Sequence, residues 1–177
     1  MATALLVIDL QRGMFGFDER PHAGEEVLSR VASLLGRARE SGIPVLHVRH
    51  DGGAGDELER GTPGWDIHPA VAPLEGEPVV DKDRCSAFHG TGLDGKLRAQ
   101  GIDRLVVAGM QTDFCIDTTC RAARDLGYSV TLVSDGHTTF DTPDLSAARI
   151  VAHHNSILQR GGFVDLAEAG KVDFQTA

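Results

Sequence analysis

The chain has few cysteines, and none of them is placed to form a covalent framework. Its 177 residues include three cysteines, an odd number without a C-x-x-C pair. This pattern argues against a disulfide-rich fold and a short zinc-ligand pair, and it favours a reducing compartment. No apolar run approaches the roughly 20 residues needed to cross a bilayer, and no basic stretch precedes an apolar core at the N-terminus. We therefore expect a soluble cytoplasmic protein with no membrane partner.

Positive charge is also scarce. The 17 Lys and Arg residues are outnumbered by 26 Asp and Glu residues, which gives a net charge of −9 at pH 7. A phosphate backbone is bound by a basic face, so we expect no nucleic-acid partner. The glycine cluster at 52–55 does not lie between a strand and a helix, as the phosphate loop G-x-G-x-x-G does. We therefore expect no nucleotide cofactor.

What the chain does contain is an alternation of aliphatic runs and helix-like segments. Continuous apolar runs are typical of strands buried on both faces. The strand candidates are 4–8, 44–48, 78–81, 105–108, 130–134 and a shorter sixth run at 163–166. Helical spacing of apolar residues, with glycine near most ends, predicts the helices. The helix candidates are 24–41, 93–100, 114–126 and 144–159.

Strands that alternate with helices predict right-handed βαβ crossovers. The expected fold is α/β, a three-layer α-β-α sandwich whose mostly parallel sheet is covered on both faces. No internal repeat or linker interrupts the chain, and its length suits a single domain spanning 1–177. The segment 50–76 is rich in glycine, proline and acidic residues and has little periodicity. It is either a functional loop, such as a lid or an interface, or a stretch that contains a short helix or strand.

Polar residues follow several of the predicted strands. Asp9 closes the first strand, Lys82 follows the third, the loop 109–115 follows the fourth, and Asp135 closes the fifth. In open α/β sheets, ligands bind beyond the carboxyl ends of the strands, where the strand order reverses. With the order 3-2-1-4-5, Asp9 and Cys115 would meet at the reversal and Lys82 would reach in. Asp135 is expected to be a structural hydrogen-bonding residue.

Cys115 lies at the start of the predicted helix 114–126. Unpaired backbone N–H groups and the helix dipole favour a thiolate there, although a cysteine packed as a small apolar residue fits the stretch equally well. If Asp9 moved the proton and Lys82 stabilised charge, the thiol could attack a carbonyl carbon and water could release the acyl group. The reaction would be hydrolysis of a C–N bond. The backbone N–H groups of Gln111 and Cys115 are candidate oxyanion-hole donors.

Three stretches resemble the isochorismatase-like cysteine hydrolases in residues, order and spacing. They are ALLVIDLQ at 4–11, VVDKDRCSAFHGTGLDGKLRAQGI at 79–102, and LVVAGMQTDFCIDTTCRAARDLGYSVTLVSDG at 105–136, which contains a G-x-x-T-x-x-C loop. The resemblance implies the family's Rossmann-like fold, with strand order 3-2-1-4-5-6, and its catalytic triad at Asp9, Lys82 and Cys115. It also implies a non-proline cis peptide between Met110 and Gln111, and a homodimer or larger homo-oligomer.

One departure from the family bears on a metal site. Nicotinamidase-type members have a D-x-H metal motif after the second strand, where this chain has Asp-Gly-Gly at 51–53. We therefore expect no metal. Three histidines are still close enough in sequence to form a site: His47, His50 and His68.

The cysteine bears on the substrate. Isochorismatases proper act on a vinyl ether, and members with that activity can lack the cysteine. Because this chain keeps Cys115, the resemblance favours a small amide, ureide or carbamoyl substrate over the ether.

Candidate walls of a substrate pocket lie in or beside the loops at the carboxyl edge of the sheet. Apolar walls with a few polar groups suit small ligands, and a glutamine there could orient a substrate amide. The candidates are Gln11, Phe15, Trp65, Phe88 and Phe114. Ordinary core packing is the alternative for each of them.

Two functions of other classes stay open. The chain could be a thiol redox sensor in which Cys120 resolves an oxidised Cys115, although their five-residue offset puts them on different faces of a helix. It could also be a non-catalytic binding protein with the same fold. Core or supporting positions are expected for Cys85 and Cys120.

Overall fold

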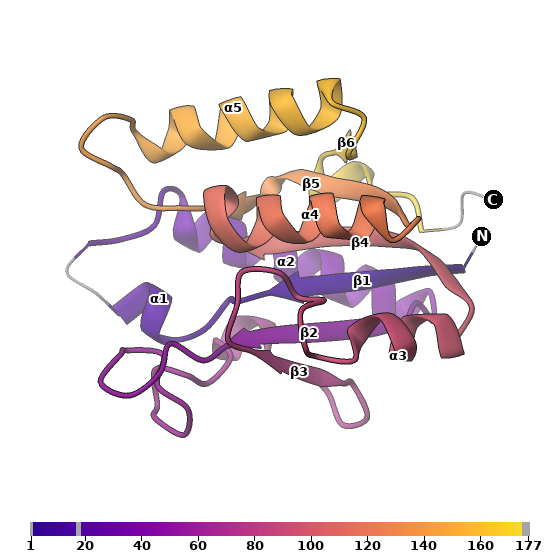
Figure 1. Ribbon diagram of the computed structural model, residues 1–177, viewed down its shortest axis with the longest axis horizontal. Coiled ribbons are helices and arrows are strands. Elements are labelled where there is room, and N and C mark those ends of the chain that lie inside the picture. The colour runs from indigo at the N-terminus through magenta and orange to yellow at the C-terminus, as the bar shows by residue number, and fades with distance from the viewer. Residues whose placement is uncertain (1, 17–18, 175–177) are drawn as a thin grey trace.

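The computed structural model describes residues 2–16 and 19–174, and these form a sheet of six strands flanked by helices (Figure 1). The strand order is β3-β2-β1-β4-β5-β6, and every neighbouring pair is parallel. The strands are β1 (Ala2–Ile8), β2 (Val45–His50), β3 (Val79–Lys82), β4 (Ile102–Met110), β5 (Ser129–Thr138) and β6 (Asp165–Ala167). The α/β fold and the strand order predicted from the sequence are confirmed.

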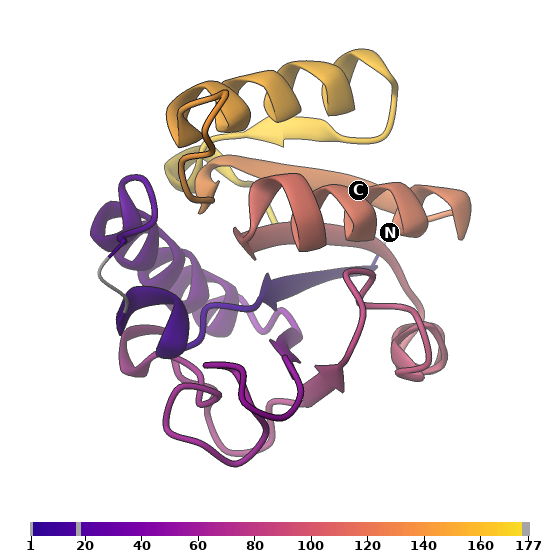
Figure 2. The same ribbon diagram turned by 60° about the vertical axis from the view of Figure 1, so that its left-hand side comes forward.

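Helices cover both faces of the sheet. One long helix, α2 (Gly24–Glu40), lies behind the sheet in Figure 1. The helices in front of it are α3 (Leu93–Ala99), α4 (Asp117–Asp125) and α5 (Ala147–Arg160). Figure 2 shows the same three layers from another side. The shorter helical turns are α1 (Gly13–Gly16), η1 (Pro69–Val71), η2 (Thr112–Ile116) and η3 (Ala169–Lys171). None of the helices in the described part of the chain is long and apolar enough to cross a membrane.

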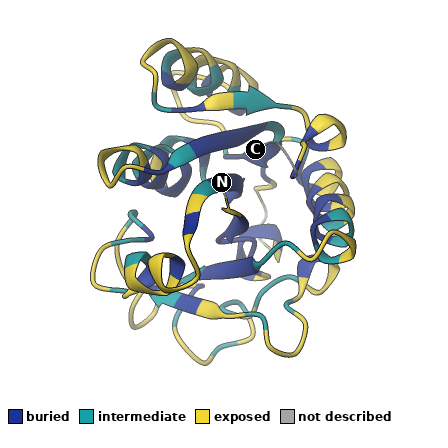
Figure 3. Cartoon of the chain, turned by 90° about the vertical axis from the view of Figure 1, so that its right-hand side faces the viewer, coloured by how far each residue is buried: buried dark blue, intermediate teal, exposed yellow. Residues whose placement is uncertain are grey.

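The residues of β1 alternate between two hydrophobic cores. Ala4, Leu6 and Ile8 pack on the side of α3, α4 and α5, whereas Leu5 and Val7 pack on the side of α2. A strand covered on both faces requires such a continuous aliphatic run. Figure 3 shows the buried inner strands and the exposed outer faces of the helices. The burial of β1 on both faces fixes it at the centre, with its end at the carboxyl edge of the sheet.

Strands β1 and β4 approach closely at this edge, where Ile8 is the register partner of Gly109. A Cβ atom on residue 109 would lie 2.0 Å from the carbonyl oxygen of Ile8. The φ of Gly109, +131°, is also rarely adopted by residues with side chains. Only glycine fits this position. The next residue after β1, Asp9, has a φ of 52°, a left-handed conformation that turns the chain out of the strand. The close approach places Asp9 beside the loop that follows β4.

The segment after β2 is attached to the stretch that follows β1. The N–H of Arg12 donates to the carbonyl of Asp66 at 2.8 Å, and the N–H of His68 donates to the carbonyl of Leu10 at 2.8 Å. Between these bonds, Gln11 and Ile67 form an antiparallel bridge. The non-periodic segment 51–68 is therefore held at the carboxyl edge of the sheet, and the short turn η1 follows it.

Two helices differ in their starts from the sequence prediction. Before α4 the chain makes the π-helical turn η2, in which the N–H of Ile116 donates to the carbonyl of Gln111 at 3.0 Å. Helix α5 begins at Ala147 instead of near 144, because the carboxylate of Asp141 accepts a hydrogen bond from the Ala147 N–H at 2.7 Å. Strand β5 also continues to Thr138, past the predicted end at 134.

Candidate functional site

The ammonium group of Lys82 lies at the centre of a buried cluster of side chains. Its Nζ donates to Asp9 Oδ2 at 2.7 Å and to Cys115 Sγ at 3.2 Å, and it lies 3.1 Å from His50 Nδ1. An ammonium carries three N–H donors, so each has an acceptor in this cluster. The structure thus brings Asp9, Lys82 and Cys115 together, and it adds His50 to them.

Each member of the cluster comes from the carboxyl end of a strand or from the loop after it. His50 and Lys82 end β2 and β3 and are register partners, Asp9 follows β1, and Cys115 lies in the turn η2 that follows β4. The order of the sheet reverses between β1 and β4, where open α/β sheets bind their ligands. The aliphatic pattern predicts a second strand that ends at 48, whereas β2 continues to His50 and pairs it with Lys82.

Burial and charge set the protonation of the cluster. Burial raises the pKa of Asp9 and the ammonium of Lys82 opposes that rise, but the 2.7 Å contact identifies the two as an ion pair. Burial lowers the pKa of Lys82, yet the charge of Asp9, together with that of Cys115 when it is ionised, outweighs burial and holds the pKa above its usual value. Burial and the nearby Lys82 lower the pKa of His50. His50 is therefore neutral at neutral pH, with Nδ1 accepting from Lys82.

Cys115 is a buried thiol next to an unused carboxylate oxygen. Burial and the negative charge of Asp9 raise the pKa of Cys115, so the resting thiol holds its proton. Asp9 Oδ1 is fully buried and has no hydrogen-bond partner among the described residues. Buried polar atoms are nearly always paired, and an unpaired one calls for an explanation. Here the oxygen can accept a proton from the thiol or a hydrogen bond from a ligand.

The same cluster contains a set of possible metal ligands. A carboxylate oxygen of Asp9, a ring nitrogen of His50 and Sγ of Cys115 lie within 4.8 Å of one another. The Lys82 ammonium already contacts all three residues, and a metal cation would have to displace it against charge repulsion. This donor set therefore does not fit a metal while Lys82 is in place.

The other two histidines considered from the sequence lie elsewhere. His47 is buried and lies 3.3 Å from the carboxylate of Glu77. The His68 ring packs against Phe15, with 5.2 Å between their centres. The three histidines make separate contacts and do not form one ligand set.

The loop between β4 and Cys115 has a fixed backbone. The peptide bond between Met110 and Gln111 is cis. The carbonyl of Gln111 accepts hydrogen bonds from the N–H groups of Phe114 and Ile116, at 3.2 and 3.0 Å. These bonds turn the chain tightly around the cysteine, so the Gln111 main chain and the thiol lie on the same short turn.

A chain of hydrogen bonds ties this loop to β5 and α5. The side-chain amide of Asn155 donates to the carbonyl of Ser134 at 2.9 Å, so its oxygen accepts from His137 Nε2 at 2.9 Å. His137 Nδ1 must then accept from the hydroxyl of Thr112 at 2.8 Å. His137 is neutral in this arrangement, and burial lowers its pKa to about 4. The sequence predicts a fifth strand that ends at 134, so residue 137 is expected in a loop and no role for His137 follows from the sequence.

Replacing His137 with glutamine is expected to reduce the loss of unfolding free energy that occurs as pH falls below 6.5. The folded protein holds His137 neutral down to a pKa of about 4, below the ordinary value of 6.5. As pH falls from 6.5 towards 4, the unfolded chain therefore gains a proton that the folded chain does not. The wild type should lose about 3 kcal/mol of unfolding free energy through this group. Urea unfolding across that pH range measures the loss.

The matched control for this experiment is His153→Gln, which changes an exposed histidine on the same helix as Asn155. That variant should keep the wild-type pH dependence. His47 and His50, whose pKa values burial also lowers, should leave a residual slope in His137→Gln. The same slope in wild type and His137→Gln would contradict a buried neutral imidazole at this position.

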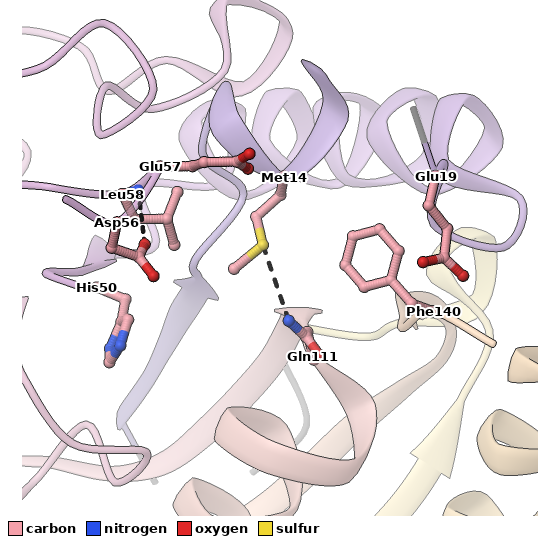
Figure 4. A pocket seen from close by; sticks show the side chains of 8 residues that line it. All are labelled: Met14, Glu19, His50, Asp56, Glu57, Leu58, Gln111 and Phe140. Carbon is pink, nitrogen blue, oxygen red and sulfur yellow. Dashed lines mark hydrogen bonds between the residues drawn. The ribbon is translucent and has the colours of Figure 1, made fainter. Parts of the chain in front are cut away.

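A pocket of about 420 Å³ opens beside the cluster. Figure 4 shows the side chains that line it, which come from α1, from the end of β2 and from the loops. They are Met14, Glu19, His50, Asp56, Glu57, Leu58, Gln111 and Phe140. His50 belongs to both the pocket and the cluster, so a ligand in the pocket would lie next to the thiol.

None of the five pocket walls predicted from the sequence is among these lining residues. Gln11 is buried. Its Oε1 accepts a hydrogen bond from the His50 N–H at 2.8 Å, and its Nε2 donates to the carbonyls of His50 and Trp65 at 2.9 and 3.0 Å. Phe15 packs in the core on the side of α2. Gln11 therefore supports the site by fixing His50, without facing the pocket.

The remaining aromatic candidates make other contacts. The Trp65 ring lies under the guanidinium of Arg49 at 3.3 Å. Phe88 stacks on Tyr128 with 5.8 Å between ring centres, and Phe114 has an exposed fraction of 53%. These side chains were predicted from their position in loops at the sheet edge, which does not determine the direction in which a side chain points.

Comparison with known proteins agrees with the fold. The model of the isochorismatase domain matches residues 3–159. Streptothricin hydrolase from Streptomyces noursei is 39% identical over 140 residues, which cover 79% of this chain and 51% of that protein. The chain therefore spans about half the length of that relative.

A second relative and a crystal structure extend the match. The ureidoacrylate amidohydrolase RutB from Stutzerimonas stutzeri is 30% identical over 173 residues, covering 75% of this chain and 68% of that protein. The crystal structure of an isochorismatase from Pseudomonas putida superposes with a TM-score of 0.89 at 32% identity, covering 95% of this chain and 88% of that one. The chain belongs to the isochorismatase family of hydrolases, the family that its three sequence motifs predicted.

Proposed function

We propose that this chain hydrolyses the C–N bond of a small amide, ureide or carbamoyl compound through a covalent acyl-enzyme on Cys115. The observation that carries the proposal is the buried cluster in which Lys82 Nζ contacts both the Asp9 carboxylate and the Cys115 thiol, at 2.7 and 3.2 Å. A nucleophile, a proton acceptor and a fixed cation are the groups that this reaction needs. The amidohydrolase among the relatives supports a C–N bond as the target.

The first half of the reaction transfers the acyl group to sulfur. Asp9 accepts the thiol proton while Sγ forms a bond to the carbonyl carbon of the substrate. The carbonyl oxygen becomes an oxyanion, to which the backbone N–H groups of Gln111 and Cys115 would donate. Asp9 returns the proton to the nitrogen, the C–N bond breaks, and the amine leaves. The acyl group remains on Sγ as a thioester.

The second half returns the enzyme to its starting state. A water molecule gives a proton to Asp9 and its oxygen attacks the thioester carbon. The C–S bond breaks, the acid leaves, and the sulfur takes back the proton from Asp9. Because burial raises the pKa of Asp9, its carboxylate is a stronger base than an exposed one, which suits both proton transfers.

The alternative of a redox sensor depends on a second reactive cysteine. Cys120 is fully buried in the hydrophobic core, and burial raises the pKa of its thiol. A thiol that holds its proton is a poor partner in disulfide exchange. This position argues against Cys120 as a resolving cysteine. A vinyl ether substrate stays a second candidate, to be compared directly with amides.

Hydrolysis assays with a panel of amides, ureides, carbamoyl compounds and one vinyl ether, in buffer with EDTA, test the proposed function. Acid quenching during turnover, followed by peptide mass spectrometry, should find the acyl group on Cys115. Asp9→Asn should slow this acylation by about 10²-fold or more, because the thiol then has no base. The control is Asp135→Asn, which changes a carboxylate within β5 that accepts a hydrogen bond from the Ala169 N–H.

Asp135→Asn should acylate at the wild-type rate. Two results would contradict the proposal: acylation at equal rates in wild type and Asp9→Asn, or turnover that leaves no acyl group on Cys115 in any quenched sample. Turnover of the vinyl ether alone would replace the amide with the ether as substrate.

A further inference from the structure

The pocket beside the cluster is walled by carboxylates. Its lining includes Glu19, Asp56 and Glu57 and contains no lysine or arginine among the described residues. Figure 4 shows Asp56 and Glu57 on the side of His50, and Glu19 on the opposite side next to Phe140. We propose, building on the proposed function, that the substrate carries a positively charged group, such as an alkylammonium or guanidinium, which these carboxylates bind.

The carboxylates of the pocket are not neutralised by the protein. None of the three forms an ion pair within the described residues, whereas Arg60, the nearest arginine in sequence to Asp56 and Glu57, is paired with Asp51 and Asp81. One carboxylate, Asp56, accepts a hydrogen bond from the N–H of Leu58 at 2.8 Å. The pocket therefore has a net negative charge that a bound cation would balance.

The pocket is connected to the nucleophile by contacts that do not involve these carboxylates. His50 lines the pocket and lies 3.1 Å from Lys82 Nζ, and its ring nitrogen lies within 4.8 Å of Cys115 Sγ. In the same cluster, Asp9 Oδ1 is a fully buried oxygen without a partner among the described residues. The acidic pocket therefore adjoins the nucleophile through His50, and the cluster next to it holds a buried oxygen that a ligand could pair.

The charge inside the cluster does not offset the carboxylates. The positive charge of Lys82 is balanced by Asp9 in a buried pair, and burial keeps His50 neutral. When Cys115 attacks, its proton passes to Asp9, and the negative charge moves from that carboxylate to the oxyanion of the substrate. A cation on the substrate would lower the energy of that state, whereas a neutral or anionic substrate would not.

The apolar lining suits the stem of such a group. Met14 lies between Glu57 and Gln111, and Leu58 lies beside Asp56 (Figure 4), so both can contact methylene groups of a ligand. Phe140 adds an aromatic side chain to the lining, and aromatic rings attract cations. The ligand chemistry is thus a short aliphatic chain with a cationic end, joined to the amide that Cys115 attacks.

The test measures how the charge of a thiol reagent affects its reaction with Cys115. Methanethiosulfonates with a trimethylammonium, a neutral or a sulfonate end are compared. For each reagent, the rate of reaction with Cys115 is divided by the rate of its reaction with free 2-mercaptoethanol. Modification of Cys115 is followed by peptide mass spectrometry. The cationic reagent should react about 100-fold faster than the anionic one. The double variant Glu19→Gln/Glu57→Gln should reduce that ratio about tenfold or more.

Two controls accompany this measurement. Glu75→Gln changes an exposed carboxylate outside the pocket and should leave the ratio unchanged. Cys85, a half-buried free cysteine, provides a second site in the same samples, and its ratio should not respond to Glu19→Gln/Glu57→Gln. Equal normalised rates for the two charged reagents, or the same ratio in wild type and the double variant, would overturn the inference.

A substrate pair separates this inference from the proposed function. The amide 4-aminobutanamide has a cationic end, and pentanamide has the same length without charge. If the protein hydrolyses both amides with equal kcat/KM, the proposed preference for a cationic substrate is wrong and the hydrolase proposal stands. If the cationic reagents are preferred but Cys115→Ala does not affect amide hydrolysis, the pocket charge preference stands and the triad mechanism is wrong.

Discussion

Replacing Cys115 with alanine is expected to abolish turnover, lowering kcat by about 10⁴-fold or more. The acyl group would have no atom to bind, and the remaining donors and carboxylate could only assist a direct attack by water. The fold should persist, because the ion pair between Lys82 and Asp9 at 2.7 Å does not involve the sulfur. The midpoint of thermal unfolding should change by no more than roughly 5 °C. Steady-state kinetics and thermal melts measure both effects.

The other two cysteines provide the matched controls. Cys120→Ala removes a fully buried sulfur from the core, so it should lower stability by about 1 kcal/mol but keep turnover. Cys85→Ala changes a half-buried free cysteine and should affect neither property strongly. Turnover retained in Cys115→Ala and lost in one of these two variants would refute a nucleophile at position 115.

The sheet and the meeting of three side chains could be predicted from the sequence because they depend on periodicity and topology. The aliphatic run before Asp9 and the one before Gly109 mark strands buried on both faces, and the alternation with helices makes them parallel. Parallel strands all end at one edge, so residues after their carboxyl ends converge. Asp9, Lys82 and Cys115 are in contact for this reason.

The pocket could not be predicted in the same way, because tertiary contacts determine the path of the segment 51–68. Its residues have no periodic apolar pattern. The segment is held by bonds to the stretch after β1, such as the one from the His68 N–H to the Leu10 carbonyl, and by the buried amide of Gln11, which brackets His50. The lining carboxylates Asp56 and Glu57 are placed by these contacts. Only the acidic composition of the segment was visible in the sequence.

His137 illustrates a different limit of sequence analysis. The stretch from Ser134 to His137 is polar and contains a glycine, which is typical of a loop. In the structure, the pairing of β5 with β4 shifts after Val107 and resumes with His137 opposite Gly109. The strand therefore continues beyond this irregularity, and the imidazole is buried against Thr112. No single-sequence pattern marks a strand that resumes in this way.

Replacing Lys82 with methionine is expected to have a large effect on both activity and stability. The variant keeps a long side chain but removes the only cation that contacts Asp9 in the cluster, and both side chains have an exposed fraction of 0%. A buried carboxylate left without its partner costs about 3–5 kcal/mol. Turnover should fall by about 10²-fold or more, since the charge that stabilises the thiolate and the oxyanion is lost. Urea unfolding and steady-state kinetics measure the two losses.

The pH dependence and a second substitution distinguish charge from packing in Lys82→Met. Burial already raises the pKa of Asp9, and loss of the ammonium raises it further. The folded variant therefore holds a proton that the unfolded chain loses above its ordinary pKa of 3.8, so the destabilisation should grow as pH rises and shrink towards acid.

Adding Asp9→Asn to Lys82→Met removes the unpaired charge. The double variant should recover most of the lost stability, because apolar or neutral groups can replace a buried ion pair at little cost, but it should stay inactive. A single variant as stable as the wild type at neutral pH, or a double variant no more stable than the single one, would show that the two side chains are not coupled through charge.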